Sequence, residues 1–327
     1  MTDRLYLGCD VGNSKTHLVL ADDDGHVHGF AVGPGGNPGR RLYAQTAEMI
    51  TSLVRRAGGR DVPIESAVLA VAGVDFEDEA AAMTAAFRRV NLAKTSLIYN
   101  DTFAVLRAGT DGTDGVAVVA GAGINCVGRY RAVDVRFHSL GRLSGDWGGG
   151  MELGLEGIGS ACRSQDGRGP QTALQGRVPA HFGMSTPLEV VDAIHRGALE
   201  HSRLTELARV VLEVAAEGDA VAVGLARRLG RETVDLVRAA VARLGCDIND
   251  LPIVLDGSLL QARNPEVVQT ITAGLAALGR RSQPTVGSAP PVLGALLLAY
   301  DAAAVRVDDR AALEAGLIES FAGQPSR

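Results

Sequence analysis

A short polar motif follows the first apolar segment of the chain and contains the residue types that bind phosphate. Asp10 ends the apolar run 5–10, and Gly12 and Asn13 tolerate the tight backbone conformations of a hairpin turn. Such a turn directs backbone N–H groups outward to phosphate oxygens, and an aspartate beside it can hold Mg²⁺ through its water shell. An ordinary hairpin remains the alternative. The residues predicted to contact phosphate are Gly12, Asn13, Ser14, Lys15 and Thr16.

A second polar motif, Asn100-Asp101-Thr102, ends another apolar segment just before a helical pattern. Strand ends that face a cleft are typical positions for catalytic groups in α/β proteins. Asp101 is therefore our candidate for a general base that accepts the proton of a substrate hydroxyl. Asn100 and Asp101 are both predicted to contact the substrate. Because aspartate also favours the N-cap position of helices, a purely structural role for Asp101 stays open.

Two small-residue motifs in the second half of the chain predict further nucleotide contacts. A Gly-Ala-Gly motif follows an apolar run, and it predicts a second turn whose N–H groups contact phosphate. A Gly-Ser pair follows a short buried segment, where small side chains let a flat adenine ring approach the backbone closely. A simple strand-to-helix turn explains this pair equally well. The predicted contacts are Gly121, Ala122, Gly123, Gly257 and Ser258.

Two glycine-rich segments indicate ligand loops. Residues 143–150 include Trp147, the only tryptophan of the chain, and three consecutive glycines. Such a run rarely serves stability, because glycine loses more conformational entropy than other residues on folding. In the second segment, residues 33–38, the side chain of Asn37 could hydrogen-bond sugar hydroxyls. A helix-cap role explains Asn37 as well.

Alternating apolar segments and helical patterns position these motifs. The first third of the chain predicts the order β-β-β-α-β-α-β-α, and three strands in succession recur after residue 114. Asn264 and Pro265 predict the start of a late helix, as cap and first helical residue. The predicted strands are 5–10, 16–21, 27–32, 66–71, 96–99, 115–120, 125–130, 133–138 and 252–255. The predicted helices are 38–57, 78–90, one after residue 101, a broken region 148–244, 265–278 and 292–305.

The repeated order predicts an α/β protein with two similar lobes and a cleft between them. We place the N-terminal lobe at residues 1–114 and the C-terminal lobe, with a helical insertion, at residues 115–291. Gly, Thr and Asp cluster at residues 110–115, as is typical of a boundary. A C-terminal helix around residues 292–321 could pack back on the N-terminal lobe.

The composition is typical of a soluble protein with an aliphatic core. The 327 residues suit two domains, and 46% of them are apolar while 21% are charged. The net charge of −6 and the scattered arginine pairs argue against a nucleic-acid partner. No apolar window approaches the roughly 18 residues of a membrane span. We therefore expect a cytoplasmic protein with a small-molecule substrate, and a homodimer stays open.

Taken in order, these motifs resemble the sugar kinase/Hsp70/actin superfamily. They are more closely similar to the BadF/BadG/BcrA/BcrD ATPase family, which includes the N-acetylglucosamine kinases. The resemblance covers nearly the whole chain and rests on LGCDVGNSKTHLVLAD, GPGGNPG, YNDTFAVL, VVAGAGINCVGR, SGDWGGG and IVLDGSLLQARNP. It implies two actin-like (ribonuclease H-like) lobes with mixed sheets flanked by helices. It also implies a kinase that uses ATP and Mg²⁺ to phosphorylate a sugar hydroxyl, as in N-acetylglucosamine or glucosamine.

The resemblance assigns roles to candidate residues. Asp101 falls where the amino-sugar kinases of this family place their base, and Asn37 falls where they place a sugar-binding asparagine. Gly145 and Asp146 match a Gly-Asp pair at the sugar site. Residues 256–258 would close over adenosine.

The chain departs from the family pattern at two places. The second phosphate loop usually has the sequence Gly-Thr-Gly-Ser, whereas residues 121–124 are Gly-Ala-Gly-Ile, so that only backbone N–H groups remain to bind phosphate. Trp147 stands where glutamate is common, in Gly-Asp-Glu-Gly. This second departure bears on which sugar is bound.

An ATPase that activates a dehydratase or reductase partner is the main alternative function. Such relatives hold a metal cluster at a dimer interface with cysteines from each subunit. Here Cys126 and Cys162 are far apart in sequence, and no Cys-Gly-Gly segment occurs. A sugar-binding repressor would carry a helix-turn-helix ahead of the first phosphate loop. Only nine residues precede Asp10, so we do not expect that class.

Overall fold

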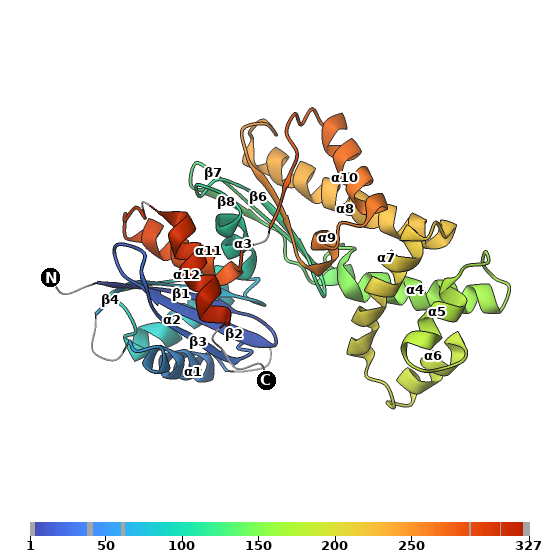
Figure 1. The fold of residues 1–327 in the computed structure, drawn as a ribbon, viewed down its shortest axis with the longest axis horizontal. Helices are drawn as coiled ribbons and strands as arrows, with labels where there is room; N and C mark the ends of the chain where they lie inside the picture. The colour runs from blue at the N-terminus through green and yellow to red at the C-terminus, as the bar shows by residue number, and fades with distance from the viewer. Residues whose placement is uncertain (1–3, 38–41, 60–62, 288, 308, 323–327) are drawn as a thin grey trace. The chain divides into compact units, whose positions relative to one another are not determined.

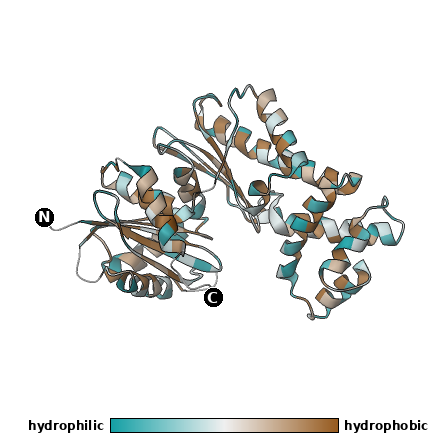
Figure 2. Cartoon of the chain, viewed as in Figure 1, coloured by the Kyte–Doolittle hydropathy of each residue, from teal (hydrophilic) through white to brown (hydrophobic). Residues whose placement is uncertain are grey.

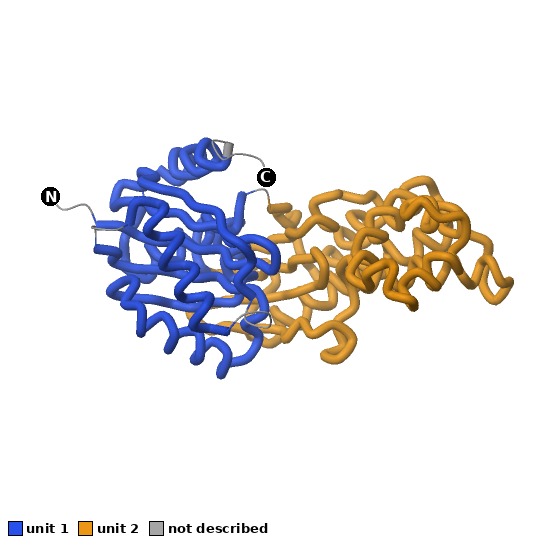
Figure 3. The backbone as a smooth tube through the Cα atoms, turned by 90° about the horizontal axis from the view of Figure 1, so that it is seen from below, with its two compact units in different colours: residues 1–113, 288–327 blue, residues 114–287 orange. Residues whose placement is uncertain are grey.

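The chain divides into two compact units, shown in different colours in Figure 3. Unit 1 comprises residues 1–113 and 288–327, and unit 2 comprises residues 114–287. The C-terminal segment therefore belongs to the same unit as the N-terminus. The computed structural model describes residues 4–322, with gaps at 38–41, 60–62, 288 and 308.

The sheet of unit 1 has five strands in the order β3-β2-β1-β4-β5. The pairs β1–β2 and β2–β3 are antiparallel, whereas β1–β4 and β4–β5 are parallel. Because β1, β4 and β5 run in the same direction, their last residues Val11, Val71 and Asn100 are neighbours at one edge of the sheet. The strands are β1 (Leu5–Val11), β2 (Lys15–Ala21), β3 (Val27–Pro34), β4 (Ile64–Val71) and β5 (Thr95–Asn100).

Helices cover both faces of this sheet (Figure 1). The helices α1 and α2 pack on one face, whereas α11 packs on β1, β4 and α3 at the other. Every residue from 292 to 300 is buried, because α11 lies between the sheet and α3. The two helices α11 and α3 lie so close together that only glycine fits at position 294. A Cβ there would lie 1.8 Å from the carbonyl oxygen of Ala104. The helices are α1 (Tyr43–Arg56), α2 (Glu77–Val90), α3 (Asp101–Ala108), α11 (Pro291–Ala302) and α12 (Arg310–Ala322).

The sheet of unit 2 has the same topology as that of unit 1. Its five strands follow the order β10-β9-β6-β7-β8, with β6–β7 and β7–β8 antiparallel and β6–β9 and β9–β10 parallel. The element order that recurs in the sequence is therefore a real structural repeat. The strands are β6 (Gly115–Ala120), β7 (Ile124–Tyr130), β8 (Val133–Arg136), β9 (Ile253–Asp256) and β10 (Thr285–Val286).

Most helices of unit 2 lie between β8 and β9 in the chain. The broken helical region of the sequence is a set of separate helices, and α7 packs between α4 and α8. Brown, hydrophobic colour is concentrated on the strands of the sheets and on inward helix faces in Figure 2. The helices are η1 (Gly141–Leu143), α4 (Gly149–Gln165), α5 (Leu174–His181), α6 (Pro187–His195), η2 (His201–Glu206), α7 (Leu207–Ala216), α8 (Ala220–Leu244), α9 (Ser258–Gln261) and α10 (Pro265–Ala277).

Most predicted elements are present, and the start of α10 is as expected, because the Asn264 side chain accepts a hydrogen bond from the N–H of Glu266 at 3.0 Å. The two-residue strand β10 was not predicted. The helix predicted over 292–305 ends earlier, at Ala302. The start of the first predicted helix, at residues 38–41, lies outside the described residues. Among the described helices, none combines the length and apolar character needed to cross a bilayer.

Candidate active site

Asp101 is the first residue of α3 and lies at the sheet edge where β1, β4 and β5 end. Its side chain is partly buried. Burial, together with the negative charges of Asp10 and Asp75, raises the pKa of the Asp101 carboxyl to about 6, while hydrogen bonds from Thr102 act in the opposite direction. A carboxylate with a pKa near neutrality is suited to accept a proton at physiological pH.

Asn100, rather than Asp101, caps α3. The side-chain oxygen of Asn100 accepts a hydrogen bond from the N–H of Thr102 at 3.1 Å, and its amide nitrogen donates to the Asp75 carboxylate at 3.1 Å. Asn100 is only 2% exposed. Both ends of the Asn100 amide are thus engaged inside the protein, and the expected contact of Asn100 with a substrate stays a prediction. The capping alternative for Asp101 loses its basis at the same time.

The turn between β1 and β2 exposes most of the residues predicted to contact phosphate. The N–H of Gly12 donates to the carbonyl of Lys15 at 2.9 Å and closes a tight hairpin. The N–H of Gly36 donates to the carbonyl of Gly12 at 3.2 Å, so the segment after β3 supports this turn. Asn13, Ser14 and Lys15 are exposed. The turn thus offers backbone, a hydroxyl and a positive charge to an anion.

Thr16 differs from its neighbours in this motif. Its side chain is fully buried, and its hydroxyl donates to the carbonyl of Pro34 at 2.8 Å. The Thr16 hydroxyl thus ties β2 to β3, and the expected phosphate contact of Thr16 stays a prediction. Strand alternation explains the difference, because Thr16 and Leu18 share the buried face while Lys15 points away from it.

Asp10 lies near the carboxyl end of β1, and its side chain is 17% exposed. Its carboxylate is 3.8 Å from the imidazole of His17, its cross-strand neighbour. A partly exposed carboxylate beside a turn that suits phosphate fits Mg²⁺, which prefers hard oxygen donors and usually keeps several of its waters. The described residues also include a potential metal-binding group, Asp22, Asp24 and His26. That group lies after β2, at the opposite end of the β1–β2 pair from Asp10.

Asn37 lies between the first turn and the segment after β4. Its amide nitrogen donates to the side-chain oxygen of Asn13 at 2.5 Å. A Cβ on Gly73 would lie 2.6 Å from the same nitrogen, so Asn37 packs directly on that backbone. The structure thus brings the predicted sugar-binding asparagine and the first phosphate turn together within unit 1.

The second glycine turn, between β6 and β7, is supported by the start of α4. The N–H groups of Gly150 and Met151 donate to the carbonyls of Gly121 and Ala122, at 2.7 and 3.0 Å. Ala122 and Gly123 are exposed, so this turn offers backbone without a hydroxyl. Both turns follow the first strand of their repeat and occupy corresponding positions in the two sheets.

The motif after β9 brings backbone close to the end of β6. Gly257 has φ of +88°, and a Cβ there would lie 2.4 Å from the carbonyl oxygen of Ala120. Asp256 is 6% exposed and accepts hydrogen bonds from the N–H of Gly257 and the amide of Gln261, at 2.6 and 2.5 Å. Ser258 is exposed at the start of α9. Only glycine fits this conformation at position 257.

A cavity of about 640 Å³ extends from Ser258 between α9 and α7. Its volume is typical of a small-molecule site. Its lining combines apolar side chains with guanidinium groups and with the carboxylates of Glu206 and Glu213. A cavity of this mixed kind can take a flat heteroaromatic ring attached to polar groups. The α7 residues were not predicted from the sequence, because helical periodicity shows which side of a helix is apolar but not what it faces. The lining includes Arg209, Leu212, Ala216, Leu259, Ala262 and Arg263.

Gly145 and Asp146 lie in the loop between η1 and α4. Asp146 is partly buried, accepts a hydrogen bond from the Ser144 hydroxyl, and donates its N–H to the carbonyl of Gly141 at 3.0 Å. Gly145 is exposed. Trp147, in contrast, belongs to the core of unit 2.

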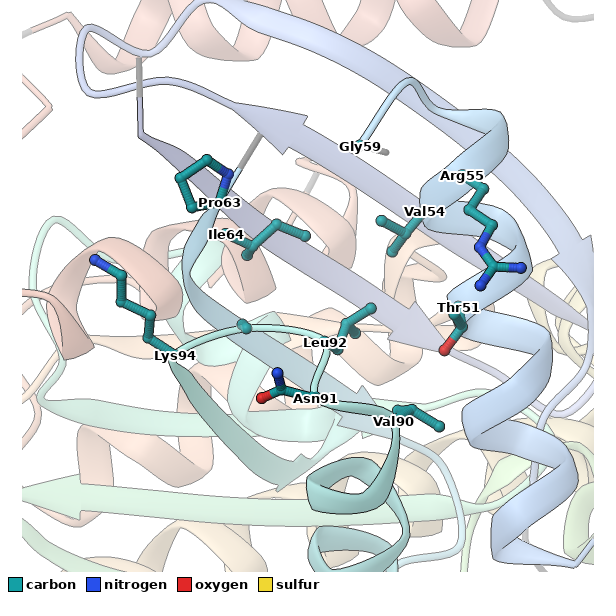
Figure 4. Close-up of a pocket in the computed structure, with 11 residues that line it drawn as sticks. Thr51, Val54, Arg55, Gly59, Pro63, Ile64, Val90, Asn91, Leu92 and Lys94 are labelled. Atoms are coloured by element: carbon teal, nitrogen blue, oxygen red, sulfur yellow. The ribbon is translucent and has the colours of Figure 1, made fainter. Parts of the chain in front are cut away.

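A cavity of about 720 Å³ in unit 1 lies apart from these residues (Figure 4). It is lined by the start of β4 and the ends of α1 and α2, including Arg55, Ile64, Asn91 and Lys94. Asp101 and Asp10 belong to the opposite, carboxyl ends of the parallel strands. The cavity therefore contains none of the predicted site residues.

Known structures share this fold. A solved structure from Chromobacterium violaceum, described as an N-acetylglucosamine kinase, matches with a TM-score of 0.70 at 21% identity, over 91% of this chain and 99% of that one. A ROK family glucokinase from Streptomyces griseus, in complex with glucose and AMPPNP, matches with a TM-score of 0.52 at 16% identity, over 91% and 99%. The likeness confirms the expected fold class, two mixed sheets flanked by helices as in actin-like sugar kinases.

The chain belongs to the BadF/BadG/BcrA/BcrD ATPase family, whose model matches residues 7–299. It is 24% identical over 266 residues to an N-acetylmuramic acid/N-acetylglucosamine kinase from Clostridium acetobutylicum, covering 80% of this chain and 87% of that protein. It is 24% identical over 279 residues to an N-acetyl-D-glucosamine kinase from Dictyostelium discoideum, covering 80% and 88%. The family expected from the sequence is confirmed.

Proposed function

We propose that this chain is an ATP-dependent kinase that transfers the γ-phosphate of ATP to a hydroxyl of an amino sugar, such as N-acetylglucosamine or glucosamine. The two curated relatives act, by their names, on N-acetylated amino sugars, and both are matched over most of their length. The observation within this chain that supports the proposal best is Asp101. It is a partly buried carboxylate with a pKa of about 6 and no capping role.

In this proposal Asp101 orients the sugar hydroxyl and accepts its proton as the bond to phosphorus forms. Asn37 would donate a hydrogen bond to another sugar hydroxyl, and Gly145 and Asp146 are further residues expected to contact the sugar. Asp10 would hold Mg²⁺ through water, and the ion supplies neutralisation of phosphate charge. The turns at residues 12–15 and 121–123 would bind phosphate oxygens through backbone N–H groups other than those of Gly12 and Gly121, which already donate to Lys15 and Gly123.

Gly257 and Ser258 would contact adenosine, with the cavity between α9 and α7 as the place for the purine ring. Positioning and electrostatic stabilisation account for most of the catalysis in phosphoryl transfer, because little covalent chemistry falls to the protein. A pKa of about 6 suits Asp101 as the proton acceptor, since a carboxyl group with this pKa is largely ionised at pH 7.

The alternative function, activation of a dehydratase or reductase partner, is not favoured. Cys9 and Cys126 are buried inside the two units, and no cysteine of the described segments belongs to a group that could hold a metal. Iron analysis of anaerobically purified protein tests this alternative, because a bound cluster would support it.

The direct test is a panel of amino sugars and hexoses incubated with ATP and Mg²⁺. ADP release and the mass of the phosphorylated sugar are measured together, so that simple ATP hydrolysis is recognised. We expect the highest kcat/KM with an amino sugar. ADP release without any phosphosugar would contradict the proposal.

A further inference from the structure

Arg263 lines the cavity between α9 and α7, and its guanidinium has no hydrogen-bond or ion-pair partner among the described residues. The other charged groups of the lining are engaged. The Glu206 carboxylate is 2.9 Å from the imidazole of His181, and the Arg209 guanidinium is 3.1 Å from the Glu213 carboxylate. The N–H donors of Arg263 are therefore available to a molecule that enters the cavity.

The backbone of Arg263 adopts a conformation that favours glycine. Its φ is +49°, in the left-handed region that L side chains rarely adopt. The residue forms the turn between α9 and α10, where its N–H donates to the carbonyl of Leu260 at 3.2 Å. Beyond it, the side-chain amide of Asn264 donates to the carbonyl of Leu212 on α7 at 2.8 Å. A glycine would meet this geometry at lower cost, so the turn itself does not require an arginine.

The chain order in this part of unit 2 places Arg263 beyond the residues expected to contact adenosine. Gly257 lies against Ala120, the last residue of β6 before the turn at 121–123. Ser258 begins α9, and Arg263 follows the end of this helix. The sequence of features is therefore phosphate turn, adenosine contacts and then Arg263. This order favours a contact of Arg263 with the base rather than with the phosphates.

The chemistry of the lining also favours a flat ring beside Arg263. Leu212 and Leu259 are buried apolar residues of the same lining and offer an apolar surface to such a ring. A guanidinium is planar and weakly hydrated, and it stacks on aromatic faces. A purine ring would use both the apolar surface and the free guanidinium. A phosphate group would use only the charge.

We propose that Arg263 is a nucleotide-binding residue whose guanidinium stacks on the purine ring of ATP. The proposal rests on the ATP-dependent function proposed above and adds to it a residue that contacts the base. Two other roles predict different results. Pairing with a phosphate requires only a positive charge, and a structural role in the turn requires no side chain.

The test compares Arg263→Gly and Arg263→Lys with the parent and with Arg131→Gly. Arg131 is a matched control, because it is also an exposed arginine with φ of +49°, and it lies in the hairpin between β7 and β8, outside this lining. Glycine accepts the left-handed conformation and removes the side chain. Lysine keeps the charge but lacks the planar group that stacks. Calorimetry with ADP and Mg²⁺ measures nucleotide affinity independently of phosphoryl transfer.

The Kd for ADP should rise about fivefold or more in both Arg263 variants, and should change less than about twofold in Arg131→Gly. The KM for the sugar should stay near the parental value. The Tm of the two glycine variants should not fall, because glycine relieves the backbone strain at both positions.

Parental ADP affinity in Arg263→Gly would overturn the inference, as would an equal loss of affinity in Arg131→Gly. Parental affinity in Arg263→Lys would overturn the stacking and favour a pairing with phosphate. If Arg263→Gly also loses Tm, the lysine variant decides, because it keeps a long side chain at the turn. If the parent itself binds no ADP with Mg²⁺, the proposed function fails first, and the two failures are thereby distinguished.

Discussion

The side-chain oxygen of Asn100 accepts the N–H of Thr102 at 3.1 Å and so caps α3 one residue ahead of Asp101. A helix has one N-cap, and here an amide fills it. The carboxylate of Asp101 is therefore not the N-cap, although it accepts hydrogen bonds from Thr102. This separation of structural and chemical roles between adjacent residues allows the two to be tested separately.

Asp101→Asn should lower kcat by roughly 10²- to 10⁴-fold, the usual contribution of a positioned proton acceptor. Tm should change little, because the cap at Asn100 remains. The matched control is Asn100→Ala, which should cost about 1 kcal/mol of folding stability through loss of the cap. An Asp101→Asn variant that melts like the parent and keeps more than about a tenth of its kcat would remove the base role. Asp146 would then be the next candidate.

Activity should depend on a group that must be ionised. Because Asp101 accepts a proton only as a carboxylate, and its pKa is raised to about 6, kcat/KM should be constant above that pH and fall below it. Asp75→Asn removes a like charge, so the pKa of Asp101 should decrease and the acid limb should move to lower pH. A limb that stays in place would show that Asp75 does not influence the titrating group.

Asn37→Ala should raise the KM for the sugar more than the KM for ATP. The lost hydrogen bond to a sugar hydroxyl is worth on the order of 1–3 kcal/mol when a polar group is left unpaired. Some effect on ATP is expected as well, since Asn37 also bonds to Asn13 in the phosphate turn. Steady-state kinetics with each substrate varied in turn measures both constants. A change confined to ATP would assign Asn37 to the nucleotide alone.

ATP should bind weakly in the absence of Mg²⁺, because adjacent phosphate charges need a counter-cation. Calorimetric titrations with Mg²⁺ and with EDTA measure the difference. Asp10→Asn should increase the Mg²⁺ concentration needed for half-maximal activity while leaving β1 intact. Equal ATP affinity with and without the ion would contradict a metal role for Asp10.

Ala262→Phe should raise the KM for ATP without changing the KM for the sugar. Ala262 lines the cavity between α9 and α7, and a phenyl ring there would occupy space assigned to the purine. Ala276→Phe is the control, because Ala276 is exposed on α10 outside this cavity. Equal KM values for ATP in the two variants would show that adenine binds elsewhere.

The sequence predicted the repeated strand order and the two glycine turns, because strand alternation and turn residues are local properties. It says less where the outcome depends on side-chain packing. Thr16 has the right type for a phosphate contact, but its position on the buried face of β2 directs its hydroxyl to Pro34. Asn100 and Asp101 both suit an N-cap, and their types alone do not decide between them.

Non-local packing explains the other misses. The strand β10 has only two residues and depends on pairing with β9, so no local pattern marks it.

The position of α11 has a consequence for the order in which the molecule matures during synthesis. The strands β1 and β4 leave the ribosome early, but the helix that covers their second face follows only after all of unit 2. Until then Tyr6, which packs on Tyr300 of α11, and Val68 lack the partner that buries them in the finished protein. Unit 2, in contrast, is one continuous stretch and can complete its core first, although it emerges second. The nascent chain therefore carries an open apolar sheet through most of translation, and this face is where chaperone binding or aggregation of the incomplete protein should occur.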